Sequence, residues 1–458
     1  MILLRFRVEN HRSIRDEAEL SLVRPSLTTA RPKDGDWVGA TTRVAGVYGA
    51  NASGKSTVVD AVEFFQAVVV SSATSWSHRR RLPQQPFRLT ARSAPEPSAY
   101  SVDFVLDDVR YQYGFEITEN AVRQEWLYDY PSTKHRVLFE REGNEFKFGR
   151  ALVGSPRLHA AATGSRALFL SKAAGNGHGL LGRLFAAFAD QIVVADFSEQ
   201  DRNRRLQQIT EGIAEGEISL NDVKTLLRVA DIGITDVGID ESEIPEDVRE
   251  FSNELTELFH RHLEPGPAES GEGTDESGPA GSTPAEHPSV KIELIRRALM
   301  FQHAGRNGVF PLPLGSQSTG TLSWLSLALP ALTILRSGGL LIVDEIDASL
   351  HPQLSQVILR MFKDPDYNHT GAQLIFTTHD TFLLSAQSDS MLTPEETWFT
   401  EKDGDGATSL FSLAEFPTRP DQNFSKRYLD GRYGAIPRTA RSFLVTLLDE
   451  ETKVRADA

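Results

Sequence analysis

Gly46-Val47-Tyr48-Gly49-Ala50-Asn51-Ala52-Ser53-Gly54-Lys55-Ser56-Thr57 is the stretch that decides the fold of this chain. It contains the spacing GxxxxGK[ST], in which a glycine at 49 and another at 54 precede Lys55 and Ser56. The apolar residues 44–48 predict a strand before the loop, and residues 57–65 predict a helix after it. A loop that connects a strand to a helix in this way is typical of phosphate binding.

The residue types in this loop suit the phosphates of a nucleotide. Its glycines allow tight turns that point backbone N–H groups at phosphate oxygens, and the helix N-terminus adds a positive dipole end. Lys55 would reach the β- and γ-phosphates, and the Ser56 hydroxyl would bind Mg²⁺. The alternative is a chance Gly/Ser-rich turn, which the flanking strand and helix disfavour. The residues expected to bind nucleotide are Gly49, Asn51, Ala52, Ser53, Gly54, Lys55, Ser56 and Thr57.

Length and composition indicate a soluble globular chain of roughly two to three domains. The chain has 458 residues, no cysteine and a formal net charge of −15. Without cysteine there are no disulfides, thiolate metal sites or cysteine nucleophile. We expect a cytoplasmic protein with no membrane attachment, because no apolar run reaches ~18–20 residues and no signal-peptide layout is present. The acidic charge disfavours a broad basic surface for duplex nucleic acid, although a local arginine patch at 79–81 or 202–205 stays open.

Changes of pattern divide the chain into four parts. Residues 1–154 contain the phosphate loop and short alternating strands, which predict an antiparallel β meander. Residues 155–263 are expected to be mainly helical. Residues 264–289 contain no Lys or Arg and are rich in Gly, Pro, Ser, Thr and Glu, which predicts a disordered acidic linker. Residues 290–458 return to apolar helices and strands, so we expect an α/β fold.

Two adjacent acids follow a strongly apolar strand. Residues 340–343 are all aliphatic and lead directly to Asp344 and Glu345. Ligands of an open α/β sheet bind at the carboxyl ends of its strands, so these acids are expected near the phosphate loop. Asp344 suits an acid that holds Mg²⁺ opposite Ser56, and Glu345 suits a general base that polarises the attacking water. A solvated turn at the end of a strand is the alternative.

Two more polar clusters lie near these acids in the sequence. His379 follows the apolar strand 373–377. A lone histidine there is most often structural, but beside a phosphate loop and an acid pair we expect it to contact the γ-phosphate. Ser318-Thr319-Gly320-Thr321 opens a long helix and is a second potential anion site, although an ordinary helix cap has the same appearance.

Several segments in the chain follow one another in a familiar order. They are Asn10-His11-Arg12-Ser13, residues 49–57, Ser318-Thr319-Gly320-Thr321, residues 340–345 with 347–352, Thr378-His379-Asp380, and residues 427–437. This order resembles the ABC-type ATPase head of structural-maintenance-of-chromosomes, Rad50, RecF and OLD-type proteins. It is most similar to the short prokaryotic AAA-family ATPases of abortive-infection and other anti-phage systems. The resemblance covers about 1–150 and 290–440 and is much less specific between them.

The resemblance implies an α/β ATPase head with an antiparallel β subdomain, an inserted mainly helical region, and ATP and Mg²⁺ as ligands. It also implies a homodimer or a higher oligomer. Lys55 and Ser56 of one subunit would hold Mg-ATP, while Ser318 and Gly320 of the other would cover the γ-phosphate. The sequence Ser-Thr-Gly-Thr differs from the LSGGQ of transporters, which argues against a transport ATPase. Heptads are not sustained, so a long coiled-coil arm for tethering DNA is not expected.

Further roles follow from the same resemblance. Asp344 would be the Walker B acid, Glu345 the catalytic base and His379 the switch histidine. Gln84 and Gln85 are candidates for the glutamine of the Q-loop. The remaining residues that the resemblance assigns are Asp347 and Ser349 in the D-loop, and Asn10 and Arg12 near the nucleotide.

These features favour an ATPase whose nucleotide-dependent dimerisation senses or gates a partner effector, in anti-phage defence. The effector would be a nuclease or toxin supplied in trans, because the chain has an ATPase set but no second active-site motif. The alternative is a DNA-repair or recombination ATPase of RecF/Rad50 type that binds DNA directly. A small-molecule kinase or a GTPase is disfavoured, since no guanine-recognition element is present. A catalytically inactive scaffold is disfavoured by the paired acids.

Overall fold

The computed structural model describes residues 1–90, 96–230, 233–243, 295–348, 350–389, 391–419 and 422–436. The chain forms two compact units: unit 1 combines Met1–Arg205 with Thr319–Ala458, and unit 2 is Leu206–Ser318. Segments from both ends of the sequence thus build one unit. The expected acidic linker at 264–289 lies outside the described residues.

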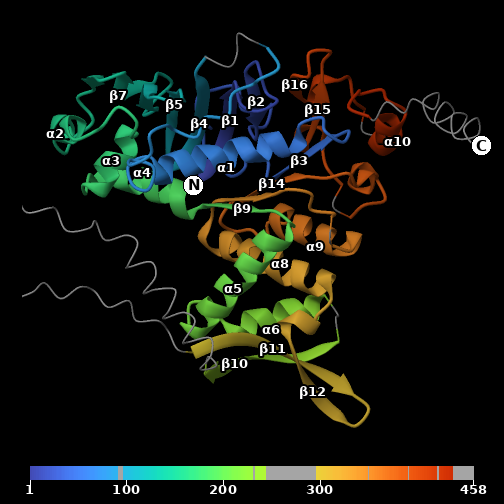
Figure 1. Ribbon diagram of the computed structural model, residues 1–458. Coiled ribbons are helices and arrows are strands. Elements are labelled where there is room, and N and C mark those ends of the chain that lie inside the picture. The colour runs from blue at the N-terminus through green and yellow to red at the C-terminus, as the bar shows by residue number, and fades with distance from the viewer. Residues whose placement is uncertain are drawn as a thin grey trace, which may run out of the picture. The chain divides into compact units, whose positions relative to one another are not determined.

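The first sheet of unit 1 has seven antiparallel strands in the order β2-β1-β4-β5-β6-β7-β8 (Figure 1). Strand β1 alternates buried with partly exposed positions along most of its length, as expected for a sheet with one face against the core, whereas β4 is buried along most of its length. The sheet confirms the predicted antiparallel β region. The strands are β1 (Ile2–Glu9), β2 (Ala18–Ser21), β4 (Ser98–Leu106), β5 (Val109–Ile117), β6 (Val122–Asp129), β7 (Arg136–Glu142) and β8 (Glu145–Phe148).

The second sheet of unit 1 has six strands in the order β16-β15-β3-β14-β13-β9. All neighbouring pairs are parallel except β15 with β16. The strands that carry the predicted motifs are completely buried, which explains their continuous apolar runs. The strands are β3 (Val44–Gly49), β9 (Ile192–Ala195), β13 (Leu340–Val343), β14 (Gln373–Thr377), β15 (Thr397–Lys402) and β16 (Thr408–Ser412).

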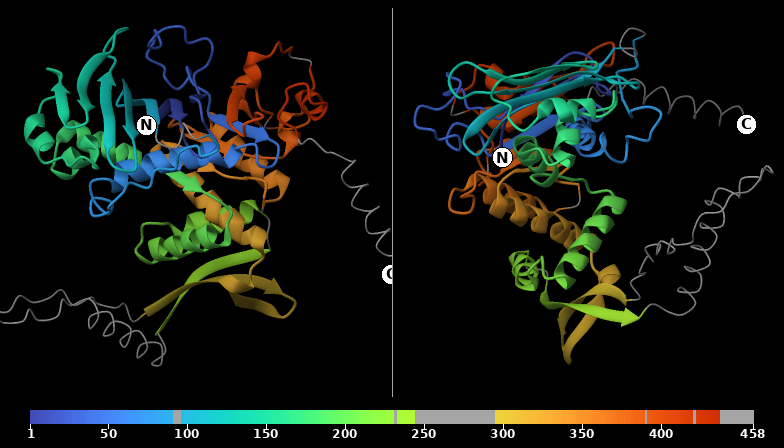
Figure 2. Two further views of the ribbon diagram at one scale, coloured as in Figure 1. Left: turned by 45° about the horizontal axis from the view of Figure 1, so that its top comes forward. Right: turned by 90° about the vertical axis from the view of Figure 1, so that its left-hand side faces the viewer.

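Helix α1 (Lys55–Ser71) joins the two sheets into one core (Figures 1 and 2). Phe65 of this helix stacks on Phe115 of β5, with 5.5 Å between the ring centroids. Val47 of β3 and Ile375 of β14 belong to the same cluster of buried side chains. Burying aliphatic and aromatic groups together contributes the main favourable free energy of folding. The phosphate loop is therefore anchored on both sides, by β3 and by α1.

The remaining helices lie in three stretches of the chain, and those between residues 206 and 318 belong to unit 2. Residues 155–263 were expected to be mainly helical, and the described part of this range contains five helices and also β10 (Ile234–Glu243). They also contain β9, which pairs in parallel with β13 and extends the six-stranded sheet. This four-residue strand was not predicted, because so short an apolar run between helices has no distinctive period. The helices are α2 (Pro156–Ala161), α3 (Phe169–Gly175), α4 (Gly179–Asp190), α5 (Glu199–Ala214), α6 (Leu220–Val229), α8 (Thr319–Ser337), α9 (Pro352–Lys363) and α10 (Phe424–Leu429).

Unit 2 is built around a three-stranded antiparallel sheet in the order β10-β11-β12. Its strands are β10 (Ile234–Glu243), β11 (Ile295–Gly305) and β12 (Gly308–Pro313). Helix α6 contacts β10, and the ammonium of Lys224 lies 2.7 Å from the carboxylate of Asp236 between them. Every residue of β12 is exposed.

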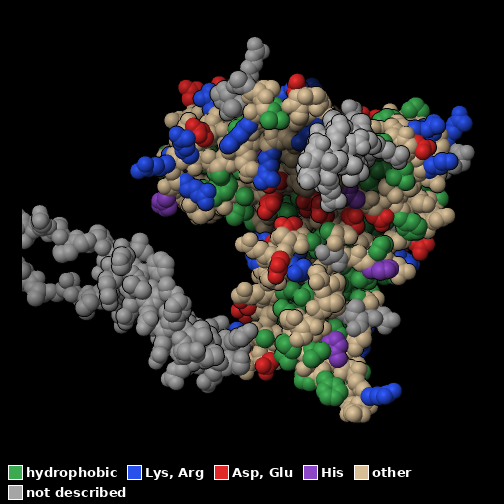
Figure 3. Space-filling model, turned by 45° about the vertical axis from the view of Figure 1, so that its right-hand side comes forward, with side chains coloured by type: hydrophobic (Ala, Val, Ile, Leu, Met, Phe, Trp, Pro, Cys, Tyr) green, Lys and Arg blue, Asp and Glu red, His purple; other side chains and the backbone are tan. Residues whose placement is uncertain are grey.

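No helix within the described ranges has the length and apolar character needed to cross a membrane. On one face of the molecule, Asp and Glu side chains gather in a band, in keeping with the formal net charge of −15 (Figure 3).

A buried pair of histidines predicts how stability depends on pH. His159 and His178 lie with ring centroids 5.5 Å apart, and their exposed fractions are 9% and 3%. Burial, followed by the neighbouring His159, lowers the pKa of His178 below its usual value of 6.5. As the pH falls below about 6.5, the unfolded chain takes up a proton at this position more readily than the folded chain. We expect this contribution to stability to be complete above that pH and to be lost below it.

The measurement is urea-induced unfolding of wild type and His178→Asn at pH 8 and pH 5.5. In wild type, Nδ1 of His178 accepts a hydrogen bond from the backbone N–H of Leu181 at 3.3 Å. An asparagine side chain keeps an acceptor at this position. The variant should lose less stability than wild type between the two pH values. His369→Asn, at an exposed position, should lose as much as wild type. Equal losses in all three proteins would show that His178 does not titrate in this way.

Candidate functional site

The phosphate loop has the backbone geometry that its glycines predicted. Gly54 has a φ of 109°, and a Cβ placed there would collide with the hydroxyl of Thr408. Ala52 also lies in the left-handed region, with a φ of 62°. Gly54 is the N-cap of α1 and has no side chain to bond the first N–H groups of the helix. The loop therefore leaves the positive end of α1 open to an anion.

Lys55 is the first residue of α1 and is 6% exposed. Its Nζ donates hydrogen bonds to the carbonyl oxygens of Gly49 at 3.0 Å and Ala50 at 3.2 Å. Burial lowers the pKa of the Lys55 ammonium, and the nearby carboxylates, that of Glu345 first, oppose this shift. A phosphate group in the loop would favour the charged ammonium further.

A pocket of about 430 Å³ lies at this loop. It brings together the loop, Glu345 from the end of β13, His379 from the end of β14 and Arg12 from the N-terminal turn. These segments are far apart in the sequence, and their convergence matches the expected meeting of strand ends. The lining residues are Arg12, Ser13, Asn51, Ala52, Gly54, Lys55, Ser56, Thr57, Glu345, His379 and Lys402.

Thr377 holds the two predicted acids in different orientations. Its hydroxyl donates to Asp344 Oδ1 at 2.5 Å and accepts a hydrogen bond from the backbone N–H of Glu345 at 2.7 Å. Glu345 has a φ of 52°, which a residue with a Cβ adopts at a cost of roughly 1–2 kcal/mol. The side chain of Glu345 is exposed and lines the pocket, whereas Asp344 is half-buried and does not line it.

The backbone of His379 is held by Asp347 of the predicted D-loop. Its N–H lies 3.2 Å and 3.3 Å from the two carboxylate oxygens of Asp347. The side chain of His379 is exposed and lines the pocket. Asp347 thus positions the segment that presents His379, and it does not line the pocket itself. Ser349, the other residue expected in this motif, lies outside the described residues.

Arg12 reaches the pocket from a turn with unusual backbone geometry. Its φ is 47°, and its guanidinium lies 2.7 Å from Asp60 Oδ1 of α1. Its Nε donates to Gln85 Oε1 at 2.6 Å. The other oxygen of Asp60 contacts Nε2 of the buried His11 at 2.7 Å. Arg12 is therefore fixed against the helix that follows the phosphate loop.

Asn10, which the resemblance placed near the nucleotide, has a different position. Its amide nitrogen donates to the carbonyl oxygens of Glu96 and Pro97 at 2.9 Å and 3.2 Å. Its amide oxygen accepts from the backbone N–H of Phe87 at 2.9 Å. The side chain is buried in these contacts and is absent from the pocket lining. Asn10 therefore ties neighbouring backbone segments together, two residues away from Arg12.

Ser318 and Gly320 do not line this pocket either. Gly320 lies in the first turn of α8, which belongs to unit 1, and Ser318 is the last residue of unit 2. The predicted signature segment thus crosses the boundary between the two units. Its expected place, over the nucleotide of a second subunit, stays a prediction.

The hairpin of β15 and β16 supports the loop through contacts that the sequence did not predict. Ser53 Oγ lies 2.7 Å from Thr400 Oγ1, and Thr408 Oγ1 donates to the carbonyl oxygen of Ser53 at 2.9 Å. Thr408 Oγ1 also lies 2.9 Å from Ser13 Oγ, which is itself 2.9 Å from Thr57 Oγ1. The apolar residues of this hairpin indicate strands, but they do not reveal what its hydroxyl groups contact.

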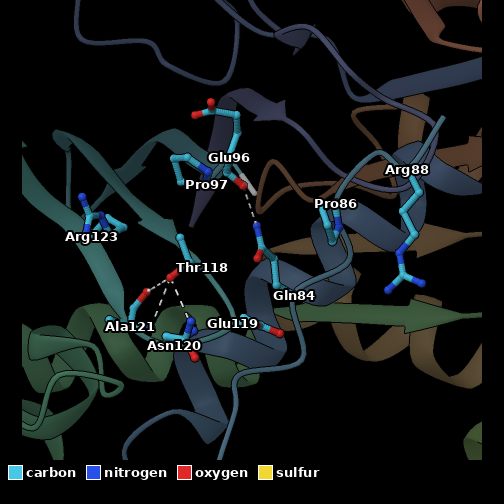
Figure 4. Close-up of a pocket in the computed structure, with 10 residues that line it drawn as sticks. All are labelled: Gln84, Pro86, Arg88, Glu96, Pro97, Thr118, Glu119, Asn120, Ala121 and Arg123. Atoms are coloured by element: carbon cyan, nitrogen blue, oxygen red, sulfur yellow. Dashed lines mark hydrogen bonds between the residues drawn. The ribbon is translucent and has the colours of Figure 1, made fainter. Parts of the chain in front are cut away.

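A second hollow of unit 1, of about 870 Å³, lies beside the seven-stranded sheet (Figure 4). Gln84 points into it, and its amide nitrogen donates to the carbonyl oxygen of Glu96 at 2.9 Å. Gln85 instead binds Arg12. Neither candidate for the Q-loop glutamine lines the pocket at the phosphate loop.

A protein family described as "AAA domain, putative AbiEii toxin, Type IV TA system" matches residues 44–385. The match covers more than half of the chain and runs from the first residue of β3 to beyond His379. This chain belongs to that AAA family. The predicted resemblance is therefore confirmed at the level of the family. Arg12 and the β15–β16 hairpin lie outside the matched part of the AAA-family chain.

Two solved structures are similar to this AAA-family chain. One is an Smc head bound to the C-terminal winged-helix domain of ScpA, with 11% identity, a TM-score of 0.38 and coverage of 90% of this chain and 97% of the other. The second is an Smc head domain with an extended coiled coil, bound to the C-terminal domain of ScpA derived from Pyrococcus furiosus. It has 14% identity, a TM-score of 0.32 and coverage of 90% and 96%. No curated protein gave a significant match.

Proposed function

We propose that this chain binds Mg-ATP at the phosphate loop and hydrolyses it to ADP and phosphate. The observation that carries the proposal is the composition of one pocket. The loop, an exposed carboxylate at Glu345 and an exposed imidazole at His379 line the same space of about 430 Å³. An anion-binding cradle beside a candidate general base is the combination that hydrolysis of a phosphoanhydride needs.

The residues present fit a nucleotide phosphate chain. The positive φ of Gly54, the open N-terminus of α1 and the ammonium of Lys55 all favour negative charge in the loop. Ser56 and Asp344 would hold Mg²⁺, because a hydroxyl and a carboxylate are the oxygen ligands that this ion prefers. When bound, Mg²⁺ would neutralise charge on the phosphates.

Glu345 and His379 would supply the remaining chemistry. Glu345 would accept the proton of the attacking water, since its carboxylate is exposed in the pocket and its backbone is fixed by Thr377. His379 would donate a hydrogen bond to the γ-phosphate from a backbone fixed by Asp347. Both assignments place fixed groups around the reacting phosphate, which is the main source of catalysis in phosphoryl transfer.

The direct test is calorimetric titration of purified protein with ATP and Mg²⁺, together with a measurement of phosphate release. We expect saturable binding and turnover that requires both Mg²⁺ and Glu345. Absence of ATP binding would overturn the proposal. Binding without any turnover would leave a nucleotide-binding protein and remove the hydrolysis step.

We also propose that ATP joins two copies of the chain, and that this dimer senses or gates an effector protein in anti-phage defence. The proposal rests on the signature segment that the sequence resemblance assigns, with Ser318 and Gly320 covering the γ-phosphate of a second subunit. Membership in a family whose description mentions an AbiEii toxin supports the link to abortive infection. We expect the effector to be a nuclease or toxin supplied in trans. Direct DNA binding stays the alternative.

Dimerisation predicts a defined change of mass. Glu345→Gln should accumulate as a dimer in native mass spectrometry when ATP and Mg²⁺ are present, because ATP bound by the variant would persist. The double variant Ser318→Glu/Glu345→Gln should stay monomeric but still bind ATP, since a carboxylate at this exposed position would repel the partner's γ-phosphate. A monomer at every ATP concentration in Glu345→Gln would contradict the dimer proposal.

A further inference from the structure

Lys402 ends β15 on the side of the strand that contacts the phosphate loop. Side chains two residues apart in a strand point to the same face, and Thr400 of this strand contacts Ser53 of the loop. Lys402 is also paired in register with Thr408 of β16, whose hydroxyl contacts the backbone of Ser53. Residues directly opposite each other in an antiparallel pair share a face. The strand geometry therefore points the Lys402 side chain towards the loop, and Lys402 is one of the residues that line the pocket.

The ammonium of Lys402 differs from the other cations of the pocket. Arg12 is paired with Asp60, and Lys55 is bonded to loop carbonyl oxygens. Among the described residues, the ammonium of Lys402 has neither a hydrogen bond nor an ion pair, and this side chain is exposed. A lysine that is free to move within a pocket keeps all three of its donors available for a ligand.

A third hollow, of about 440 Å³, adjoins the phosphate pocket. Arg12, Ser13 and Lys402 line both spaces, so these residues lie at the border between the phosphate pocket and the third hollow. The hollow is lined in addition by the apolar side chains of Pro86, Phe87 and Leu89, and by Gln85, Arg88 and Gly406. Phe87 is completely buried, with the Arg15 guanidinium over its ring, so the accessible groups are the aliphatic side chains of Pro86 and Leu89 and the guanidinium of Arg88. This mixture suits the partly apolar nucleoside end of a nucleotide.

We propose that Lys402 is a further nucleotide-binding residue, which contacts the phosphates nearest the nucleoside as the ligand passes from the loop into the adjoining hollow. This inference rests on the proposed ATP binding and deepens it. Lys55, at the first residue of α1, would contact the phosphates at the other end of the chain. The phosphates of the ligand would therefore be bound by cations from two different parts of the sequence, Lys55 and Lys402.

The test is calorimetric titration of Lys402→Met with ATP and with ADP. Methionine keeps the length and apolar stem of lysine and removes only the charge. We expect both nucleotides to bind about tenfold more weakly, by the same factor, because a charge-assisted hydrogen bond to phosphate is lost. Lys402→Arg should restore most of the affinity. The control is Lys33→Met, since Lys33 is exposed and lines neither space, and it should match wild type.

Failure of this inference is distinguishable from failure of the proposed function. If wild type binds ATP and Lys402→Met binds it as tightly as Lys33→Met does, Lys402 is not a nucleotide-binding residue. A loss for ATP alone, with ADP unchanged, would assign Lys402 to the γ-phosphate and overturn the position proposed here. If wild type binds neither nucleotide, the proposed function fails, and this inference fails with it.

Discussion

Glu345→Gln is expected to bind ATP as wild type does and to lose turnover by roughly 10²–10⁴-fold, the usual contribution of a positioned general base. Glutamine has the shape of glutamate but cannot accept a proton at neutral pH. The backbone contacts that position this residue, from Thr377 to the Glu345 N–H, are unaffected by the change. The strained φ of 52° also stays, so the variant should report the chemistry of the carboxylate alone.

The measurement is single-turnover phosphate release beside calorimetric ATP binding. Glu217→Gln makes the same chemical change at an exposed position of unit 2 outside the pocket, and it should match wild type. Turnover of Glu345→Gln within a few-fold of wild type would show that another group activates the water. Loss of ATP binding in this variant would show instead that Glu345 shapes the site.

Lys55→Ala is expected to lose ATP binding itself, by about 10²-fold or more. The substitution removes a buried charge whose hydrogen bonds to phosphate contribute roughly 1.5–3 kcal/mol each, and a tenfold change in affinity corresponds to about 1.4 kcal/mol. Turnover should fall with binding, in contrast to Glu345→Gln. The two variants therefore separate recognition of the nucleotide from its hydrolysis.

Competition binding of a fluorescent ATP analogue measures this loss. Lys33→Ala is the matched control, at an exposed lysine outside the pocket. Circular dichroism checks the fold, because Lys55→Ala also removes the partner of the Gly49 and Ala50 carbonyl oxygens. A folded Lys55→Ala protein with the ATP affinity of wild type would rule out the phosphate loop as the nucleotide site.

Local patterns in the sequence were sufficient to predict the loop, the acid pair and His379. Each motif follows a buried strand, and such strands have continuous apolar runs that end abruptly in polar residues. Parallel strands place their carboxyl ends at one edge of the sheet, so the motifs could be expected to meet. Strand β9 escaped prediction because four apolar residues between two helices have no period of their own.

The sequence by itself determined the phosphate loop, the order of the motifs and the α/β class, because these depend on contacts between residues close together in the chain. Only the tertiary structure decided that Arg12 lines the pocket while Asn10 does not, and that Thr400, Lys402 and Thr408 surround the loop. Ser53 and Thr400 are separated by 347 positions. No local period or turn signal specifies a pairing at that separation, since it is fixed by how the strands order themselves in the sheet.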